Sequence, residues 1–303
     1  MKLLPLAAAP RCCAYAPHDR RMPFVNAATL AGGGALLLWA FLAVLARAAA
    51  GIPPLQLTAM GFAVGGTLGL AWALARGGLS ALRQPPIAWA HGVGGLFGYH
   101  ALYFAALAWA PPAEANLLNY LWPLLIVLLS APILGMRLGP WRLLGVAMGF
   151  AGSLVLLAGG AHFAPDAWAG FALALGCAFT WALYSVLARR LAEVPTEAVA
   201  GFCLASAVLG LAAHALFESW VWPDARQWLA IALLGAGPVG AAFFLWDIGM
   251  KRGDPRLLGT LGYAVPVAST VLLALWGEAA LDGRLLLAMA LVAGGGVIAA
   301  RAK

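Results

Sequence analysis

Charge is what this sequence has least of. Only 10% of the 303 residues are Asp, Glu, Lys or Arg, whereas a water-soluble domain carries about a quarter. A chain so poor in charge cannot cover a surface with ionised side chains, which excludes an ordinary soluble domain. Because hydrophobic residues make up 64% of the chain, the composition predicts a protein that resides in a lipid bilayer.

Cysteine is scarce as well, and its four positions form neither a disulfide framework nor a metal-ligand spacing. The sequence has no glycine-rich phosphate loop and no plausible Ser/His/Asp or Cys/His set at one depth. We therefore expect no enzyme, no cofactor and no metal. An integral membrane enzyme acting on a lipid head group stays open as an alternative, although it predicts a cytoplasmic cluster of His and acidic residues that the sequence does not contain.

Long uncharged runs dominate the sequence instead. Nine of ten such runs reach the roughly 20 residues that a helix needs to cross a bilayer. The tenth, 285–300, is shorter, but Arg284 and Arg301 can extend it by snorkelling. The sequence thus predicts an all-α integral membrane protein of ten transmembrane helices. The approximate spans are 26–48, 54–76, 86–109, 112–135, 140–159, 167–190, 196–218, 227–250, 256–278 and 283–301.

Positive charge is distributed unequally between the two sides of these spans. If the N-terminus is cytoplasmic, fifteen Lys and Arg residues lie inside, and only Arg47, Arg226 and Arg284 lie outside. Such an excess is the usual signal for the cytoplasmic side. The isoelectric point near 9.6 therefore reflects membrane topology, and we expect no nucleic-acid partner. Both termini are predicted to be cytoplasmic.

The chain is one helical unit written twice. The segment WAFLAVLAR at 39–47 returns as WALYSVLAR at 181–189, and a Tyr-x-x-Pro signature occurs at 120–123 and again at 263–266. Because five spans are an odd number, the two halves must enter the membrane in opposite directions, which makes an inverted repeat. The predicted divisions are a disordered N-terminal tail (1–21), a first five-helix repeat (22–159) and a second five-helix repeat (160–303).

Polar and aromatic side chains inside apolar spans mark the candidate site, because polar groups are costly in a bilayer. At 100° per residue, several of them share helix faces with small residues. If these faces turn inward, they surround a central cavity suited to a flat, amphipathic solute. The predicted substrate-binding residues are Trp39, Tyr99, His100, Tyr103, Asn116, Asn119, Tyr120, Trp122, Trp181, Tyr184, Ser185 and Tyr263.

Three prolines, Pro123, Pro238 and Pro266, interrupt predicted spans. Proline bends a helix, and broken helices at corresponding positions of two repeats point to a binding region. We expect hinges there, with static kinks as the simpler alternative. No carboxylate falls at the middle of a span, and Asp247 and Lys251 have the spacing of an ion pair on one helix. The sequence therefore favours transport without obligatory proton coupling.

The tryptophan in the first span of each half and the proline in the fourth resemble the EamA family of the drug/metabolite transporter superfamily. Tyr99-His100, Tyr120-Leu121-Trp122-Pro123 and Trp181 further resemble the YddG-type exporters of aromatic amino acids. One departure concerns the Gly-Glu pair with which such proteins end spans four and nine. Gly277-Glu278 matches it, whereas the first half has Gly135-Met136.

The resemblance implies a transporter in a bacterial inner membrane that exports aromatic amino acids. We expect a secondary carrier that works by alternating access within the lipid bilayer, and a monomer is one option for its oligomeric state, which the sequence leaves open. The resemblance places the substrate against the side chains of His100, Tyr99, Tyr120, Trp122 and Trp181. Methionine, threonine and cationic drugs are further candidate substrates. A related carrier of a different metabolite or drug shares the scaffold and stays open.

Overall fold

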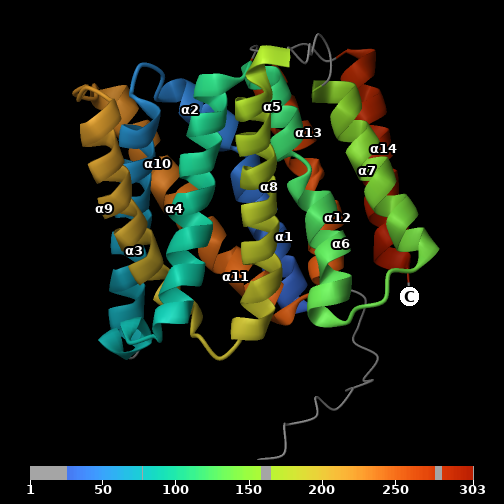
Figure 1. Ribbon diagram of the computed structural model, residues 1–303, viewed down its shortest axis with the longest axis horizontal. Coiled ribbons are helices and arrows are strands. Elements are labelled where there is room, and N and C mark those ends of the chain that lie inside the picture. The colour runs from blue at the N-terminus through green and yellow to red at the C-terminus, as the bar shows by residue number, and fades with distance from the viewer. Residues whose placement is uncertain (1–25, 77, 158–164, 277–281, 303) are drawn as a thin grey trace, which may run out of the picture.

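The computed structural model describes residues 26–76, 78–157, 165–276 and 282–302, and in this part of the chain all regular structure is helical. Figure 1 shows the helices standing side by side along a common direction, as in a membrane bundle. The predicted tail, 1–21, and the pair Gly277-Glu278 lie outside the described residues.

The helices follow the predicted spans to within a few residues. The longer ones are α1 (Ala27–Ala40), α2 (Leu42–Ala48), α3 (Pro54–Arg76), α4 (Pro86–Trp109), α5 (Pro112–Asn119), α6 (Trp122–Leu134), α7 (Pro140–Leu157), α8 (Trp168–Ala188), α9 (Val199–Phe217), α10 (Ala225–Ala236), α11 (Ala242–Arg252), α12 (Pro255–Gly262), α13 (Ala264–Leu275) and α14 (Gly283–Arg301). The short elements are η1 (Leu79–Leu82), η2 (Pro165–Ala167), η3 (Arg189–Leu191), η4 (Thr196–Ala198) and the π-helix η5 (Gly237–Ala241).

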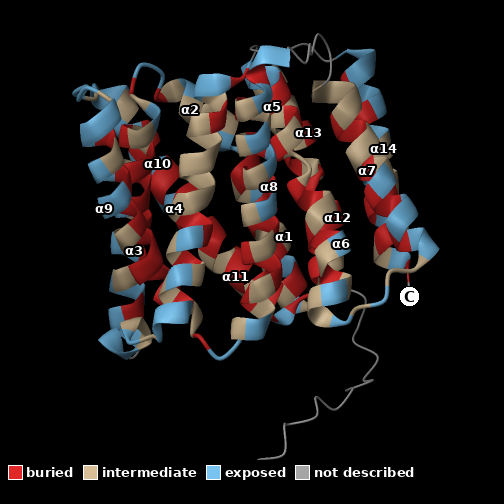
Figure 2. Cartoon of the chain, in the orientation of Figure 1, coloured by how far each residue is buried: buried red, intermediate tan, exposed pale blue. Residues whose placement is uncertain are grey.

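Nine helical segments of the described chain are long and apolar enough to cross a membrane, so the chain is a multi-pass membrane protein. The 24-residue helix α4 is long enough but is not one of the nine. It contains two His, two Tyr and four Gly, which lower its mean hydropathy. Figure 2 colours stretches of α9 and α14 on the outside of the bundle as exposed. The exposed residues include large apolar ones, which a bilayer would cover. Examples are Leu68, Leu211, Leu216, Leu286 and Leu287.

Two of the predicted hinge prolines stand just after a break between helices. Pro123 lies in the first turn of α6, and Pro266 lies near the start of α13. A proline ring clashes with the carbonyl four residues earlier and cannot donate a hydrogen bond to it. Those earlier residues are Asn119 and Gly262, the last residues of α5 and α12. Pro238 lies within the π-helix η5, between α10 and α11.

Contacts between helices are arranged symmetrically with respect to the two halves of the chain. The main packed pairs are α3 with α9, α4 with α8, α1 with α11, α6 with α12, and α7 with α14. Exchange of the halves leaves the pairs α3–α9 and α7–α14 unchanged and turns the pair α4–α8 into the pair α11–α1. The pair α6–α12 joins the fourth predicted span of one half to the fourth of the other. Helices at corresponding positions of the two halves therefore pack against corresponding partners.

Two hydrogen bonds fix the relative direction of α1 and α8. The Asn26 side chain, at the start of α1, donates to the Arg252 carbonyl at 3.0 Å. Arg189, at the end of α8, donates to the Gly253 carbonyl at 2.6 Å. The start of α1 and the end of α8 thus lie together, so the two helices run in opposite directions. We call the end of the bundle formed by Asn26, Arg189, Arg252 and Gly253 the basic end.

An ionised carboxylate holds several helices at the basic end. Asp254 accepts hydrogen bonds from Arg142 of α7 and Arg256 of α12, each at 3.1 Å. Burial disfavours the charged carboxylate, but these hydrogen bonds and the positive charges outweigh it, so the pKa of Asp254 lies below its ordinary value. Arg142 also donates to the Ala302 carbonyl at 2.8 Å, so the end of α14 belongs to the same network.

Glycine allows α7 and α14 to pack backbone against backbone. A Cβ atom on Gly295 would lie 2.5 Å from the carbonyl oxygen of Gly145. We therefore expect Gly295→Ala to lower the stability of the protein by about 1–3 kcal/mol through overpacking, measured as a lower Tm in detergent. Gly33→Ala is the matched control, because a Cβ atom there meets no heavy atom within 4 Å. An equal Tm for both variants would contradict this packing.

Candidate functional site

The two tryptophans at equivalent positions of the repeated motif meet in the interior. Trp39 of α1 and Trp181 of α8 lie edge to face, with ring centroids 5.5 Å apart. Trp246 of α11 lies 5.1 Å from Trp39 and stacks on Trp181 at 6.2 Å. Trp122 of α6 adds an edge contact to Trp246 at 6.0 Å. All four rings are buried, and we call them the tryptophan cluster.

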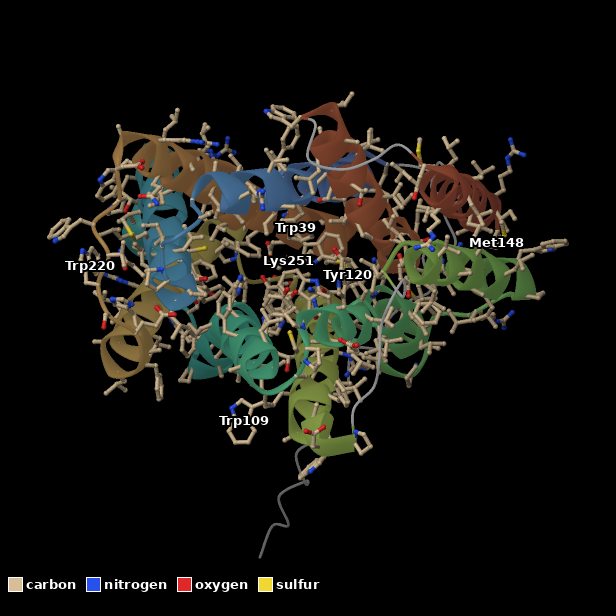
Figure 3. The ribbon with its side chains drawn as sticks, turned by 90° about the horizontal axis from the view of Figure 1, so that it is seen from above. Trp39, Trp109, Tyr120, Met148, Trp220 and Lys251 are labelled. Atoms are coloured by element: carbon tan, nitrogen blue, oxygen red, sulfur yellow. The ribbon has the colours of Figure 1, made fainter. Side chains whose placement is uncertain are left out.

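The cluster lies at the centre of the bundle. In the view from above, Trp39 and Tyr120 lie near the middle of the molecule, whereas Trp109 and Trp220 lie at its edge (Figure 3). The two edge residues are exposed, Trp109 to 66% and Trp220 to 42%, as expected for tryptophans of an interfacial belt. The structure therefore separates interior tryptophans from peripheral ones.

Trp246 is not among the site residues predicted from the sequence. It is fully buried, and its indole N–H donates to the Ser185 hydroxyl at 3.0 Å. Ser185, a predicted site residue, thus accepts the hydrogen bond of one tryptophan of the cluster. A signal was available, because Trp246 follows Phe243 by three residues within an uncharged run and the two rings share a helix face.

A second group of predicted residues forms hydrogen bonds between α4 and α5. The Tyr103 hydroxyl donates to Asn116 Oδ1 at 2.6 Å, and the Asn119 amide donates to the Tyr99 hydroxyl at 3.1 Å. The ring of Tyr99 lies 5.2 Å from that of Trp181. This tyrosine–amide group therefore continues directly from the tryptophan cluster.

His100 packs beside the same group. Its Nδ1 lies 2.8 Å from the Leu96 carbonyl oxygen, which can only accept, so Nδ1 carries a proton. The neutral ring then offers Nε2 as an acceptor. The ring contacts Tyr99 at 5.2 Å and Phe62 at 5.1 Å, so the imidazole is part of the aromatic interior.

Two predicted tyrosines lie elsewhere. Tyr184 contacts Trp181 at 5.2 Å but stacks on His91 at 4.7 Å, on the side toward the basic end. Tyr263 is fully buried in a separate apolar cluster, where it meets Phe150 at 6.0 Å. The structure brings Tyr184 to the border of the site and does not bring Tyr263 into it.

The tryptophan rings touch one another, so no open cavity separates them. A space of about 10 Å³, lined in part by Tyr184, His91 and Asp247, lies toward the basic end, room for about one water. Trp39, Trp181 and Tyr184 are buried, whereas the tyrosine–amide residues Tyr99 and Tyr103 are partly exposed. Tyr99 and Tyr103 are thus more exposed than Trp39, Trp181 and Tyr184. The predicted central cavity therefore does not extend between the tryptophan rings in this conformation.

An ion pair closes the interior on the basic side. Lys251 Nζ lies 2.8 Å from Asp247 Oδ2, which confirms the ion pair predicted from their spacing on one helix. Lys251 also donates to the Val194 carbonyl at 2.7 Å, and Thr196 donates to Asp247 at 2.7 Å. Both charged side chains are buried. The pair therefore fastens α11 to the segment between α8 and α9.

A hydrogen bond connects the tryptophan cluster to the irregular turn between α10 and α11. The Trp39 indole N–H donates to the Pro238 carbonyl in η5 at 2.9 Å. Single turns of π-helix are frequent at functional sites. Among the described residues, no three His, Cys, Asp or Glu side chains come together in a way that could hold a metal ion.

Comparison with known proteins decides the family. Residues 27–158 and residues 168–301 each match the model of the EamA-like transporter family. The chain belongs to the EamA-like transporter family. This confirms the resemblance seen in the two tryptophan motifs and the two Tyr-x-x-Pro signatures, and it makes the chain a transporter by descent.

Three similar proteins show how far the likeness extends. The aromatic amino acid exporter YddG of Ancylobacter novellus is 56% identical over 278 residues, which cover 90% of this chain and 97% of the relative. An uncharacterized transporter of Acidianus ambivalens is 27% identical over 168 residues, or 54% of this chain and 64% of the relative. A solved crystal structure, 56% identical, superimposes with a TM-score of 0.87 and covers 90% of this chain and 96% of its own.

Proposed function

We propose that this protein exports aromatic amino acids across a bacterial inner membrane. The observation that carries the proposal is the meeting of Trp39 and Trp181, one from each half of the chain, beside hydrogen-bonding tyrosines and amides. Aromatic rings offer large apolar faces to a flat ring, and hydroxyl and amide groups suit the polar end of an amino acid. The name of the Ancylobacter novellus relative supports the same substrate class.

The proposed topology has ten spans, with α4 as the third, arranged as two inverted repeats (22–159 and 160–303). The opposite directions of α1 and α8 and the symmetric helix contacts support it. We assign the basic end to the cytoplasm because positively charged residues favour that side. Both termini are then cytoplasmic, since Asn26 and Ala302 belong to this end.

The proposed mechanism is alternating access by a monomer. The ion pair of Asp247 and Lys251 closes the cytoplasmic side, while Tyr99 and Tyr103 keep partial exposure. An aromatic substrate enters between the tyrosine–amide group and the tryptophan cluster and replaces ring contacts that the side chains now make with one another. The helix breaks next to Pro123 and Pro266, together with Pro238 in η5, are the proposed hinges.

Proteoliposomes test the substrate directly. Vesicles that contain the purified protein and are loaded with labelled tryptophan or phenylalanine should release the label several-fold faster than protein-free vesicles. Unlabelled tyrosine should compete, because it presents the same ring and polar end. Release at the protein-free rate would reject the proposal, and stronger competition by a cationic drug than by tyrosine would favour a drug carrier of the same family.

A further inference from the structure

Tyr99, Asn119 and Cys177 form a hydrogen-bonded chain across three helices. The Cys177 thiol of α8 donates to Asn119 Oδ1 at 3.3 Å and lies 3.4 Å from the Tyr99 carbonyl oxygen. The Asn119 amide of α5 donates to the Tyr99 hydroxyl of α4 at 3.1 Å. Cys177 and Asn119 are buried, whereas Tyr99 keeps partial exposure. The buried members therefore stand behind the accessible one.

The chemistry of these groups decides which of them donates and which accepts in each hydrogen bond. A thiol in contact with two oxygen acceptors acts as the donor, so it engages the oxygen end of the Asn119 amide. The NH₂ end then faces Tyr99 and donates to its hydroxyl oxygen. A hydroxyl that accepts in this way keeps its own proton for another acceptor. Tyr99 is therefore left with an available O–H donor.

The neighbouring tyrosine has the opposite role. Tyr103 stacks parallel to Tyr99 at 6.2 Å, but its hydroxyl donates to Asn116 Oδ1 at 2.6 Å. Its proton is therefore already used within the protein. Two tyrosines on one helix face thus differ in what they can offer a ligand, and the difference comes from the amide that each one meets.

We propose that Asn119 and Cys177 are positioning residues that keep the Tyr99 hydroxyl proton directed to the carboxylate of the bound amino acid. This rests on the proposed function. The ring of Tyr99 lies 5.2 Å from that of Trp181, so a substrate ring at Trp181 brings its carboxylate within reach of Tyr99. Lys251 does not compete for the carboxylate, since it is bound to Asp247 and the Val194 carbonyl.

Asn119→Asp tests the direction of the hydrogen bonds that link Cys177, Asn119 and Tyr99. The carboxylate has the shape of the amide but, when ionised at alkaline pH, it can only accept. The Tyr99 hydroxyl then donates to the carboxylate at position 119, so its proton is no longer available to bind the substrate. We expect the KM for tryptophan to rise about 10- to 100-fold, the range for one hydrogen bond to a charged group, with kcat little changed. Tyr99→Phe should give a similar rise, and the double variant should rise no further.

Tryptamine supplies a readout that a general packing defect would not move, because it has the ring of tryptophan but no carboxylate. The unmodified protein should prefer tryptophan to tryptamine as competitor, and Asn119→Asp and Tyr99→Phe should lose most of that preference. Cys177→Ser, which keeps a donor, should retain the preference better than Cys177→Ala. Cys203→Ala is the matched control, since this other buried cysteine lies on α9 outside the chain of hydrogen bonds.

The outcomes separate this inference from the proposed function. If the unmodified protein transports no aromatic amino acid, the proposed function fails. If it transports tryptophan but Asn119→Asp leaves the preference over tryptamine unchanged, the positioning role is wrong and the proposed function stands. Additive KM increases in the double variant would likewise overturn the role, because they would mean that Asn119 acts independently of Tyr99.

Discussion

Trp181→Ala should reduce the export of tryptophan by at least about 10-fold at low substrate concentration. The indole lies against Trp39, Tyr99 and Trp246, from three other helices, so its removal takes away a face that several helices share. An aromatic pair contributes about 0.5–1.5 kcal/mol beyond the area that it buries, and the substrate would lose such a contact as well as apolar burial. The measurement is the initial rate of efflux from proteoliposomes with matched amounts of protein.

Two variants separate transport from folding in this experiment. Trp181→Phe keeps an aromatic face and should retain more activity than the alanine variant at a similar Tm. Trp222→Ala removes a tryptophan that is 80% exposed and should leave the efflux rate unchanged. If Trp181→Ala transports like the unmodified protein, Trp181 is not part of the substrate site.

Lys251→Met should lower stability by about 3–5 kcal/mol, because it leaves Asp247 as a buried charge without its partner. The double variant with Asp247→Leu should recover much of this loss, since replacing both members of a buried ion pair by apolar groups is often neutral. Export should be slowed in the single variant more than in the double one. Thermal unfolding in detergent and efflux rates measure the two effects.

The ion pair at the edge of the same end provides the comparison. Arg76 and Glu197 are 3.9 Å apart, and the arginine side chain is 64% exposed, so Arg76→Met should cost less than about 1 kcal/mol. A Lys251→Met variant as stable as Arg76→Met would show that the buried pair does not hold α11 to the segment between α8 and α9.

The helix bounds could be predicted closely because two kinds of residue, charged residues and prolines, mark them in the sequence. Charged residues interrupt the apolar runs, and prolines such as Pro54, Pro86 and Pro140 stand at the first position of a helix, where proline loses no hydrogen bond. Helix α4 was predicted from its length and lack of charge, although its histidines and glycines leave it less apolar than the other spans.

The candidate site was predictable only in part. The repeat pointed to Trp39 and Trp181 because both occupy the same place in a duplicated motif, and they meet. The same logic fails for Tyr263, which corresponds to Tyr120 but is buried in a separate apolar cluster, since sequence symmetry does not say how each helix is rotated. Trp246 was missed because it lies outside the duplicated motifs, and its spacing from Phe243 shows only that the two rings share a helix face. Its contacts come from three other helices, which the order of residues does not reveal.

The turn of π-helix at Gly237–Ala241 has a consequence for the rest of its span. A helix advances about 100° per residue, so the loss of the one extra residue in this wide turn would rotate everything after it by that angle relative to α10. Trp246 and Asp247 both lie after it, on α11. A shift of register within these five residues would therefore rotate Trp246 and the Asp247–Lys251 ion pair together. Trp39 is coupled to the same turn, because its indole N–H donates to the Pro238 carbonyl.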